Sequence, residues 1–372
     1  MGIEVRRVSS KSELRQFIYL PEKIHGGHEN WLPPLYVDEW NFFDPKKNKS
    51  FGYSETILVI AYREGRAVGR IMGIINKRYN ELKGENNARF GYLECYNDPE
   101  ISHVLLHFIE RWAKEYKCNR IVGPYGFSDK DPQGFMVEGF EHPPLIAAAC
   151  NWPWIVPLLE AEGYTKEVDC LVFMFRIHDN LPPLYGRINE RVEKREGISL
   201  VEFSSKKQMK PYIIPIFRLM NETYSELYGF VPLEEQEMKD FAARYMPILD
   251  PRFIKAVEYK GEMAAFIIGI PSMTKGIQKS KGRLLPFGLF HILSAARKTK
   301  QIDLMLGAVK NSLQGQGLEI LMALKLMESM KTAGFEQIEI HLVLETNHRM
   351  IAEMNRIGAS IHKRFRVFGK DL

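Results

Sequence analysis

The chain has 372 residues, of which 45% are hydrophobic and 26% are charged. This composition is that of a globular protein with a sizeable core, and the length suggests two domains or one large one. The formal net charge of +5 is mildly basic, which is weak evidence for an anionic partner such as a phosphorylated cofactor, a nucleic acid or a membrane surface.

The cysteines and the N-terminus exclude several classes of protein. Cys95, Cys118, Cys150 and Cys170 form no Cys-x-x-Cys pair, so we expect neither a disulfide framework nor a zinc site, and no metal. The first residues carry charges where a signal peptide needs an apolar run. No segment reaches the roughly 20 apolar residues that span a bilayer. We therefore expect a cytoplasmic protein.

The first half is predicted to mix strands and helices. Residues 55–76 hold two β-rich runs around a short charged turn, which predicts a hairpin, and 90–95 predict a further strand. Asp98 is placed to cap a helix that begins at Pro99, because apolar residues follow at helical spacing. Three elements come next: a short strand at 119–124, a short helix that Gly163 closes, and a strand at 170–177.

The second half repeats this order of elements. A hairpin is predicted over 253–271, followed by a strand at 302–309, a helix from Leu318 to about Gly334, a strand at 337–344, a short helix closed by Gly358 and a last strand. The polar, proline-containing segment before it reads as a connection. We therefore expect an N-terminal domain over 1–180, a linker over 181–197 and a C-terminal domain over 198–372.

The stretch from Gln314 to Gly317 is a candidate ligand-binding loop. It follows the strand that ends at Val309 and precedes the helix that opens at Leu318. Glycines let the backbone approach a ligand closely, and the free N–H groups of a first helical turn favour a phosphate. The simpler alternative is a turn that binds nothing.

With the elements around it, this stretch resembles the GNAT superfamily of acyl-CoA-dependent N-acyltransferases. Residues 314–319 are similar to the pyrophosphate loop Q/R-x-x-G-x-G/A, and Asn347 to Gly358 is similar to the helix that follows it in that family. The first half resembles a degenerate second copy, in which Asn151 to Gly163 is similar to the same helix. The resemblance implies an α/β (α+β) fold of two tandem GNAT-like domains, each a mixed, mostly antiparallel twisted sheet flanked by helices. It also implies that the fourth and fifth strands splay apart around the pantetheine arm.

The resemblance further implies acyl-CoA or acetyl-CoA as co-substrate. The residues implied to bind it are Val309, Gln314, Gly315, Gln316, Gly317, Leu318 and Asn347. Two positions depart from the pattern. Glu319 stands where the family has Gly or Ala, and its carboxylate would repel a pyrophosphate unless it points away. Met354 stands where many members carry a general-acid tyrosine.

Acyl transfer to an amine also needs a base that takes a proton from the attacking ammonium. Glu345 is the first candidate because it lies at the splay beside Asn347, and His341 lies on the same face of the strand. In the first half, Glu94 ends a strand just before a helix and Asp131 lies in a loop. If the two halves share one cleft, Glu94 would serve a cofactor on the second half. Helix capping, packing or surface exposure are the simpler roles for all of these residues.

Residues 275–300 form an apolar segment with basic flanks. A helix is predicted from Pro286 to between Ala296 and Lys300, which is too short to span a bilayer. One interpretation packs it between the two domains. The other makes it an interfacial helix, in which an apolar anchor is combined with lysine and arginine attraction to an anionic membrane.

The tandem domains, together with short motifs such as "GRLLPFG", resemble the branch of the superfamily that contains bacterial ceramide synthases. This resemblance implies a long-chain lipid amine, a sphingoid base, as acceptor, and a protein held peripherally at the inner face of the membrane. One alternative is a soluble N-acetyltransferase acting on a small amine or a protein. Another is a non-catalytic CoA- or lipid-binding module, which Glu319 and Met354 would suit. No nucleic-acid motif is recognised, so no such partner is expected.

Overall fold

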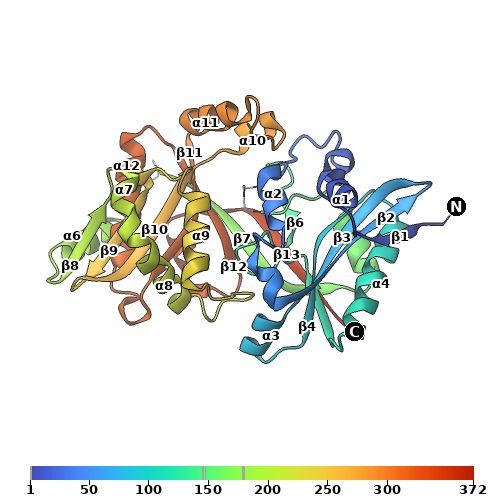
Figure 1. The fold of residues 1–372 in the computed structure, drawn as a ribbon. Coiled ribbons are helices and arrows are strands. Elements are labelled where there is room, and N and C mark those ends of the chain that lie inside the picture. Colours follow the sequence, from blue (N-terminus) through green and yellow to red (C-terminus); the bar gives the residue numbers. More distant parts are fainter. Residues whose placement is uncertain (1, 145, 147, 178–180) are drawn as a thin grey trace. The chain divides into compact units, whose positions relative to one another are not determined.

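The computed structural model describes residues 2–144, 146, 148–177 and 181–372 (Figure 1). The chain forms two compact units. Unit 1 takes the residues up to Leu171 together with Met273–Ser294 and His362–Leu372, and unit 2 takes Val172–Ser272 and Ala295–Ile361. This division differs from the expected domain boundaries, because most of the apolar segment and most of the last strand belong to unit 1.

Unit 1 is an α/β sandwich built on one sheet. Its strands are β1 (Glu4–Arg7), β2 (Ser54–Arg63), β3 (Arg66–Asn76), β4 (Asn87–Cys95), β5 (Arg120–Gly123), β6 (Phe135–Glu138), the first part of β7 (Thr165–Arg176) and the later part of β13 (Ser360–Asp371). Its helices are α1 (Lys11–Ile24), α2 (Tyr36–Phe42), η1 (Lys49–Tyr53), α3 (Lys77–Lys83), α4 (Pro99–Glu115), α5 (Ile155–Ala161), α10 (Thr274–Ser280) and the start of α11 (Gly288–Lys298). The order β1-β2-β3-β4-β5-β13 is antiparallel except for the parallel pair β4–β5.

Strand alternation explains why helices cover both faces of this sheet. Along β2, Ile57 and Val59 pack in the same core as α4, whereas Ile60 and Tyr62 pack in the core that includes α1 and α2. The predicted β2–β3 hairpin is confirmed. Its turn residues Glu64 and Gly65 have φ of 52° and 72°, the backbone that tight hairpins favour.

Unit 2 repeats this architecture. Its strands are the rest of β7, β8 (Ile198–Glu202), β9 (Ile254–Tyr259), β10 (Glu262–Pro271), β11 (Gln301–Val309) and β12 (Gln337–Leu344). Its helices are α6 (Pro183–Glu193), α7 (Lys206–Met209), η2 (Lys210–Tyr212), α8 (Ile213–Thr223), α9 (Glu235–Tyr245), η3 (Pro251–Phe253), η4 (Asn311–Leu313), α12 (Leu318–Thr332) and α13 (His348–Arg356). The order is β7-β12-β11-β10-β9-β8, with β11–β12 parallel and β8 to β11 antiparallel. The expected mixed, mostly antiparallel fold is confirmed.

The parallel strands separate in both units. In unit 2, β11 pairs with β12 only from Gln301↔Gln337 to Leu304↔Ile340, although β11 continues to Val309. In unit 1, β4 pairs with β5 only as far as Arg89↔Val122. The pairing of β11 with β10 shifts register between Ile268 and Gly269, which marks a bulge at this point. The strands therefore diverge as expected for the splay.

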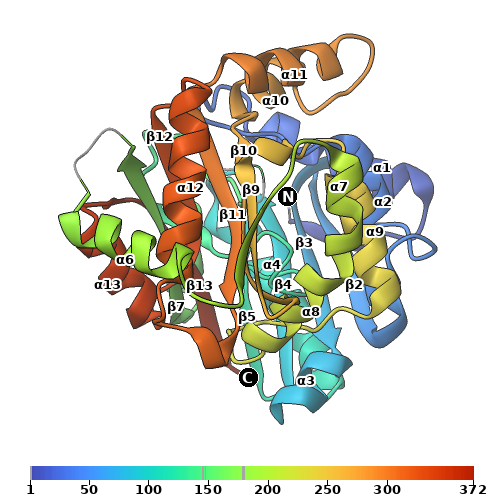
Figure 2. The same cartoon turned by 90° about the vertical axis from the view of Figure 1, so that its left-hand side faces the viewer.

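The segment expected to be a linker contains helix α6. Tyr185 and Val192 are buried in it, and α6 packs along α12 (Figure 2). Apolar side chains at Tyr185, Ile188 and Val192 have helical spacing, but polar neighbours mask the pattern.

Hydrogen bonds with main-chain groups anchor residues 273–294 to the rest of unit 1. The backbone N–H of Tyr36 donates to the carbonyl of Gly282 at 3.0 Å, and Nε2 of Gln278 donates to the carbonyl of Trp31 at 3.2 Å. Helix α10 buries Ile277, and α11 begins at Gly288, close to the expected start. Among the described residues, no helix is long and apolar enough to cross a bilayer.

Candidate functional site

The loop Gln314–Gly317 connects the separated end of β11 to α12 in unit 2. Gly315 and Gly317 have φ of 72° and 89°, where side chains are strained. A Cβ at Gly315 would meet no atom within 4 Å, so this side of the loop is open. A Cβ at Gly317 would lie 2.7 Å from Cγ2 of Ile188, so this glycine instead allows α6 to pack closely.

The first turn of α12 offers backbone donors beside this loop. Gly317 is the N-cap residue and supplies no side chain, while Leu318 is fully buried. The first N–H groups of an α-helix have no acceptor within the helix, and the helix dipole adds partial positive charge. Together with the open side of Gly315, this arrangement suits a phosphate group.

Two arginines hold the loop, and the sequence interpretation missed both. Nη1 of Arg349, in α13, donates to Oε1 of Gln314 at 2.7 Å, and Nη1 of Arg195 donates to Oε1 of Gln316 at 2.5 Å. Nε2 of Gln314 donates in turn to the carbonyl of Val309 at 3.3 Å. The loop therefore carries two guanidinium groups that a polyanion could use, since guanidinium pairs well with phosphate.

Glu319 and Met354 are the two positions that depart from the family pattern. Glu319 lies in the first turn of α12, and its Oε2 is buried without a hydrogen-bond partner among the described residues. Met354 is buried in α13 and can donate no proton. The neighbouring Glu353 accepts a hydrogen bond from the hydroxyl of Tyr185. Burial, together with Glu353, raises the pKa of Tyr185 to about 12, so this phenol stays protonated at neutral pH.

The residues predicted around β12 lie at its separated end. Asn347 caps α13, because its Oδ1 accepts from the N–H of Met350 at 3.2 Å. Glu345 is half-buried in the turn before it, and His341 is half-buried on β12. Leu342 has a φ of 40°, which interrupts the regular alternation on which the shared face of His341 and Glu345 was inferred.

The separated half of β11 is contacted by a tyrosine that the sequence did not indicate. The hydroxyl of Tyr224 donates to the carbonyl of Gly307 at 2.9 Å and lies 3.4 Å from its N–H. Gly307 pairs with Ile267 of β10, and both backbone groups of one strand residue point to the same side. The Gly307 groups therefore point away from β10, toward the side from which β12 has diverged.

In unit 1, Glu94 belongs to a chain of buried and partly buried polar groups. Its Oε1 accepts from Nη2 of Arg70 at 2.6 Å, and its Oε2 lies 3.1 Å from Nε2 of His25. Nδ1 of His25 lies 3.0 Å from Nδ1 of His28. Burial alone would raise the pKa of Glu94, but Arg70 and His25 outweigh burial and lower it. Burial, with a further contribution from His25, lowers the pKa of His28 to about 4.

Two further acids lie near this chain: Asp131, which was predicted, and Glu39, which was not. Burial raises the pKa of Asp131 to about 6, although backbone N–H groups of Ser128 and Phe127 oppose the change. Burial raises the pKa of Glu39 to about 7, while Arg70 opposes this and Glu94 and Asp131 add to it. Glu39 lies on the short helix α2, far in sequence from the other acids, so only the fold reveals the cluster.

Comparison with known proteins gives full-length matches. No family model matches the chain. Over 381 residues it is 28% identical to "Bacterial ceramide synthase" of Caulobacter vibrioides, covering 100% of this chain and 98% of that protein. Over 377 residues it is 26% identical to "Protein YghO" of Escherichia coli K12, covering 99% and 95% respectively.

Solved structures match the fold across both units. A tandem GNAT protein from the clavulanic acid biosynthesis pathway has a TM-score of 0.58 at 14% identity and covers 100% of this chain and 98% of that one. A GCN5-related N-acetyltransferase from Sphaerobacter thermophilus has a TM-score of 0.54 at 13% identity, covering 99% and 95%. The resemblance seen in the sequence is confirmed: this chain has a tandem GNAT fold and is similar over its whole length to a bacterial ceramide synthase.

Proposed function

We propose that this protein is an acyl-CoA-dependent N-acyltransferase that acylates a long-chain lipid amine, with a sphingoid base as the favoured acceptor and ceramide as the product. The observation that carries the proposal is the open loop Gln314–Gly317 between the separated strand β11 and the N-terminus of α12. Full-length similarity to a protein named as a ceramide synthase supports the choice of acceptor.

The acyl donor would bind in unit 2. The pyrophosphate would take the backbone N–H groups from Gly315 to Leu318, with Arg349 and Arg195 beside it. The pantetheine arm would run along β11 beyond Leu304, where pairing with β12 has ended. Asn347 caps α13, the helix that carries Arg349.

The chemistry is attack by a neutral amine on the thioester carbonyl. The nitrogen lone pair forms the C–N bond, the C–S bond breaks, and the sulfur takes the electron pair as a thiolate. The nitrogen then releases its second proton, which the departing thiolate can take, and the neutral amide results. A thiol of pKa about 8.5 can leave without a proton donor, so Met354 does not block the reaction. We assign proton removal from the ammonium to Glu345, at the open end of β12. His341, Glu94 and Asp131 are the alternatives.

A lipid acceptor is supported by the exposed surface of residues 284–300. Five large apolar side chains there are 42–82% exposed: Leu285, Phe287, Leu289, Phe290 and Leu293. No acid occurs in the sequence between Glu262 and Asp303. Exposed basic residues precede and follow the apolar ones along the chain: Lys275, Lys279, Lys281, Arg283, Arg297, Lys298 and Lys300. An apolar anchor within a cationic rim favours a peripheral position on an anionic membrane.

A thiol-release assay tests the proposal. Acetyl-CoA and palmitoyl-CoA are offered with a sphingoid base or with a small soluble amine, and free thiol is measured together with the melting temperature. We expect release with palmitoyl-CoA and the sphingoid base, and a higher melting temperature with the donor.

Two glycine variants form a matched pair for this assay. Gly315→Glu places a carboxylate on the open side of the loop and should abolish both signals. Gly261→Glu has a similar left-handed φ of 80° and similar open space, but lies in the β9–β10 turn, and should keep both. Release only with acetyl-CoA and the small amine would replace the lipid acceptor by a soluble one. A donor-induced rise in melting temperature without any release of thiol would indicate a binding module. The absence of both signals would overturn the donor site.

A further inference from the structure

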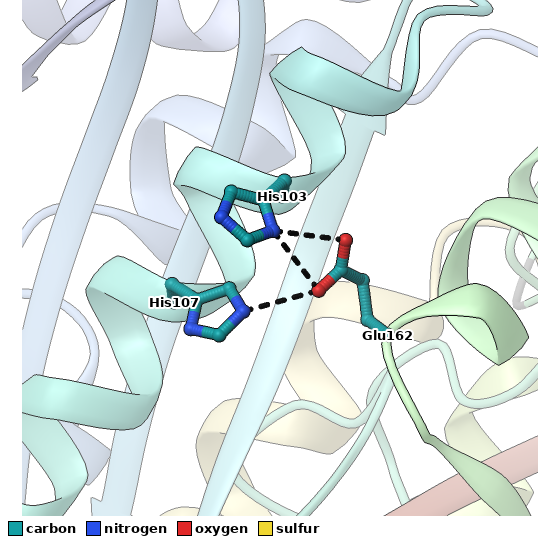
Figure 3. A group of neighbouring side chains, drawn as sticks. All are labelled: His103, His107 and Glu162. Atoms are coloured by element: carbon teal, nitrogen blue, oxygen red, sulfur yellow. Dashed lines mark hydrogen bonds and ion pairs between the residues drawn. The ribbon is translucent and has the colours of Figure 1, made fainter.

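Unit 1 carries a group of side chains that acyl transfer does not use. His103 and His107 are one turn apart on α4, and both face Glu162 at the end of α5 (Figure 3). Nδ1 of His103 lies 3.1 Å from Oε1 of Glu162, and Nε2 of His107 lies 3.1 Å from Oε2. Positions i and i+4 of a helix share a face, so the backbone itself brings the two imidazoles together.

The donor atoms have the spacing of a metal site. Ligand atoms of the three residues lie within 4.8 Å of one another. Nitrogen and oxygen ligands lie about 2.0–2.2 Å from zinc, which places neighbouring ligands of a tetrahedral ion about 3.3 Å apart. The observed separations of 3.1 Å are close to this edge length. The side chains of His103 and His107 are 55% and 44% exposed, so an ion can reach them from solvent.

A second carboxylate lies beside one of the imidazoles. Oε2 of Glu110 lies 3.5 Å from Nδ1 of His107, and Oε1 of Glu110 accepts from Nζ of Lys370 at 2.8 Å. A carboxylate facing Nδ1 favours a proton on that nitrogen, which leaves the Nε2 lone pair directed at Glu162. Ligating histidines commonly have such a partner behind them.

The elements that present the three ligands are well anchored. The face of α4 opposite solvent packs in the main core of unit 1. Helix α5 ends at Glu162 because Gly163 has a φ of 82°, and the next residue, Tyr164, is buried. Ligands on rigid elements lose little freedom when an ion binds.

We propose that His103, His107 and Glu162 bind one divalent transition-metal ion, with zinc the best match to two imidazoles and a carboxylate. Three protein ligands leave a fourth position for water. The ion would cross-link α4 to the end of α5. This proposal goes beyond acyl transfer, and it differs from the expectation of no metal, which rested on the spacing of the cysteines. A His-x-x-x-His pair on a predicted helix is the sequence signal that points to it.

Metal titration of the untagged, chelator-treated full-length protein tests the site. Zinc binding is followed by calorimetry, cobalt binding by visible absorption, and folding by the melting temperature with and without zinc. We expect one saturable equivalent of zinc, a cobalt spectrum with ligand-field bands, and a melting temperature that rises with zinc concentration.

Variants separate this site from adventitious binding. Glu162→Gln and His107→Gln should each weaken zinc binding at least tenfold and remove the zinc-dependent rise in melting temperature. Glu160→Gln removes an exposed acid from the same helix, and His348→Gln removes an exposed histidine from unit 2; both should bind zinc like the wild type. If either ligand variant has a lower melting temperature than the wild type in the absence of zinc, His103→Gln is tested in its place. No saturable binding by the wild type, or equal binding by the ligand variants, would overturn the proposal.

Discussion

A single hydroxyl contacts the backbone where the acyl donor is proposed to lie. Tyr224 bonds both polar groups of Gly307, beyond the last β11–β12 pair at Leu304↔Ile340. An extended ligand beside an unpaired strand binds through the same N–H and C=O groups. The phenol and the pantetheine arm would therefore compete for Gly307.

Removal of this hydroxyl should tighten donor binding. Tyr224→Phe frees the Gly307 groups, and a net hydrogen bond is worth about 1 kcal/mol, so the Kd for palmitoyl-CoA should fall roughly fivefold. Calorimetric titration measures the change. Tyr116→Phe, which removes an exposed hydroxyl in unit 1, should leave the Kd unchanged. Weaker binding by Tyr224→Phe would instead place the phenol among the groups that hold the donor.

At the scale of elements, α11 exposes its apolar residues. Only Gly288 and Ile292 of this helix are buried. Phe290 in the helix is 68% exposed, and Phe287, which immediately precedes it, is 70% exposed. An exposed apolar patch of this kind, on a segment without acidic residues, marks an interaction site.

Residues 279–293 should therefore carry the protein to anionic vesicles. Cosedimentation with vesicles containing phosphatidylglycerol measures this. Lys279→Glu with Lys281→Glu should weaken binding at least about tenfold, because each basic residue near such a surface contributes about 1 kcal/mol. Arg283 is left intact because it pairs with Glu22 at 2.6 Å.

Two further variants complete the vesicle experiment. Phe287→Ser with Phe290→Ser should weaken binding through loss of the apolar anchor. The control Lys114→Glu with Lys117→Glu makes the same charge change at exposed positions on and just after α4. If the wild type fails to sediment with anionic vesicles at low salt, peripheral membrane binding is ruled out.

The sequence predicted those elements whose signals are local. Helix α4 begins where Asp98 and Pro99 indicated, and the hairpins turn at residues with positive φ. The segment that forms helix α6 was interpreted as a linker. Its helical structure depends on packing against α12, which follows it by more than 120 residues, so no clear local signal indicates it. The glycine loop was found from its motif. Arg195 and Glu39 were missed because only tertiary folding brings them to their sites.

At the scale of the whole molecule, the two units share a fold but differ at the equivalent helix N-terminus. In unit 2 the first turn of α12 follows the glycine loop and has no side-chain cap. In unit 1 the carboxylate of Asp98 caps α4, accepting from the N–H of Glu100 at 2.9 Å and pairing with Arg63 at 2.6 Å. A carboxylate at that place takes a free donor and repels a phosphate. From this difference we propose that each chain binds one acyl donor, in unit 2.

The two leading candidates for the base are Glu345 in unit 2 and Glu94 in unit 1. Their variants should differ in whether they lower kcat or the stability of the fold. Glu345→Gln should lower kcat at least tenfold and leave both the melting temperature and the donor Kd near wild type, because it removes a proton acceptor at an open turn. Glu94→Gln should instead destabilise the fold by about 3 kcal/mol, because it leaves the buried guanidinium of Arg70 without its anionic partner.

A second measurement is the pH dependence of the free energy of unfolding, obtained by urea unfolding of the wild type and of Glu94→Gln. The pKa of Glu94 is lowered in the folded protein, so its ion pair stabilises the fold above the unfolded value of 4.5. As the pH falls through the lower, folded pKa, the carboxylate is protonated and this contribution is lost. The stability difference between the two proteins should therefore be full at pH 7 and shrink as the pH falls below about 4.5. A Glu94→Gln variant that keeps its stability but loses kcat would move the base from Glu345 to unit 1.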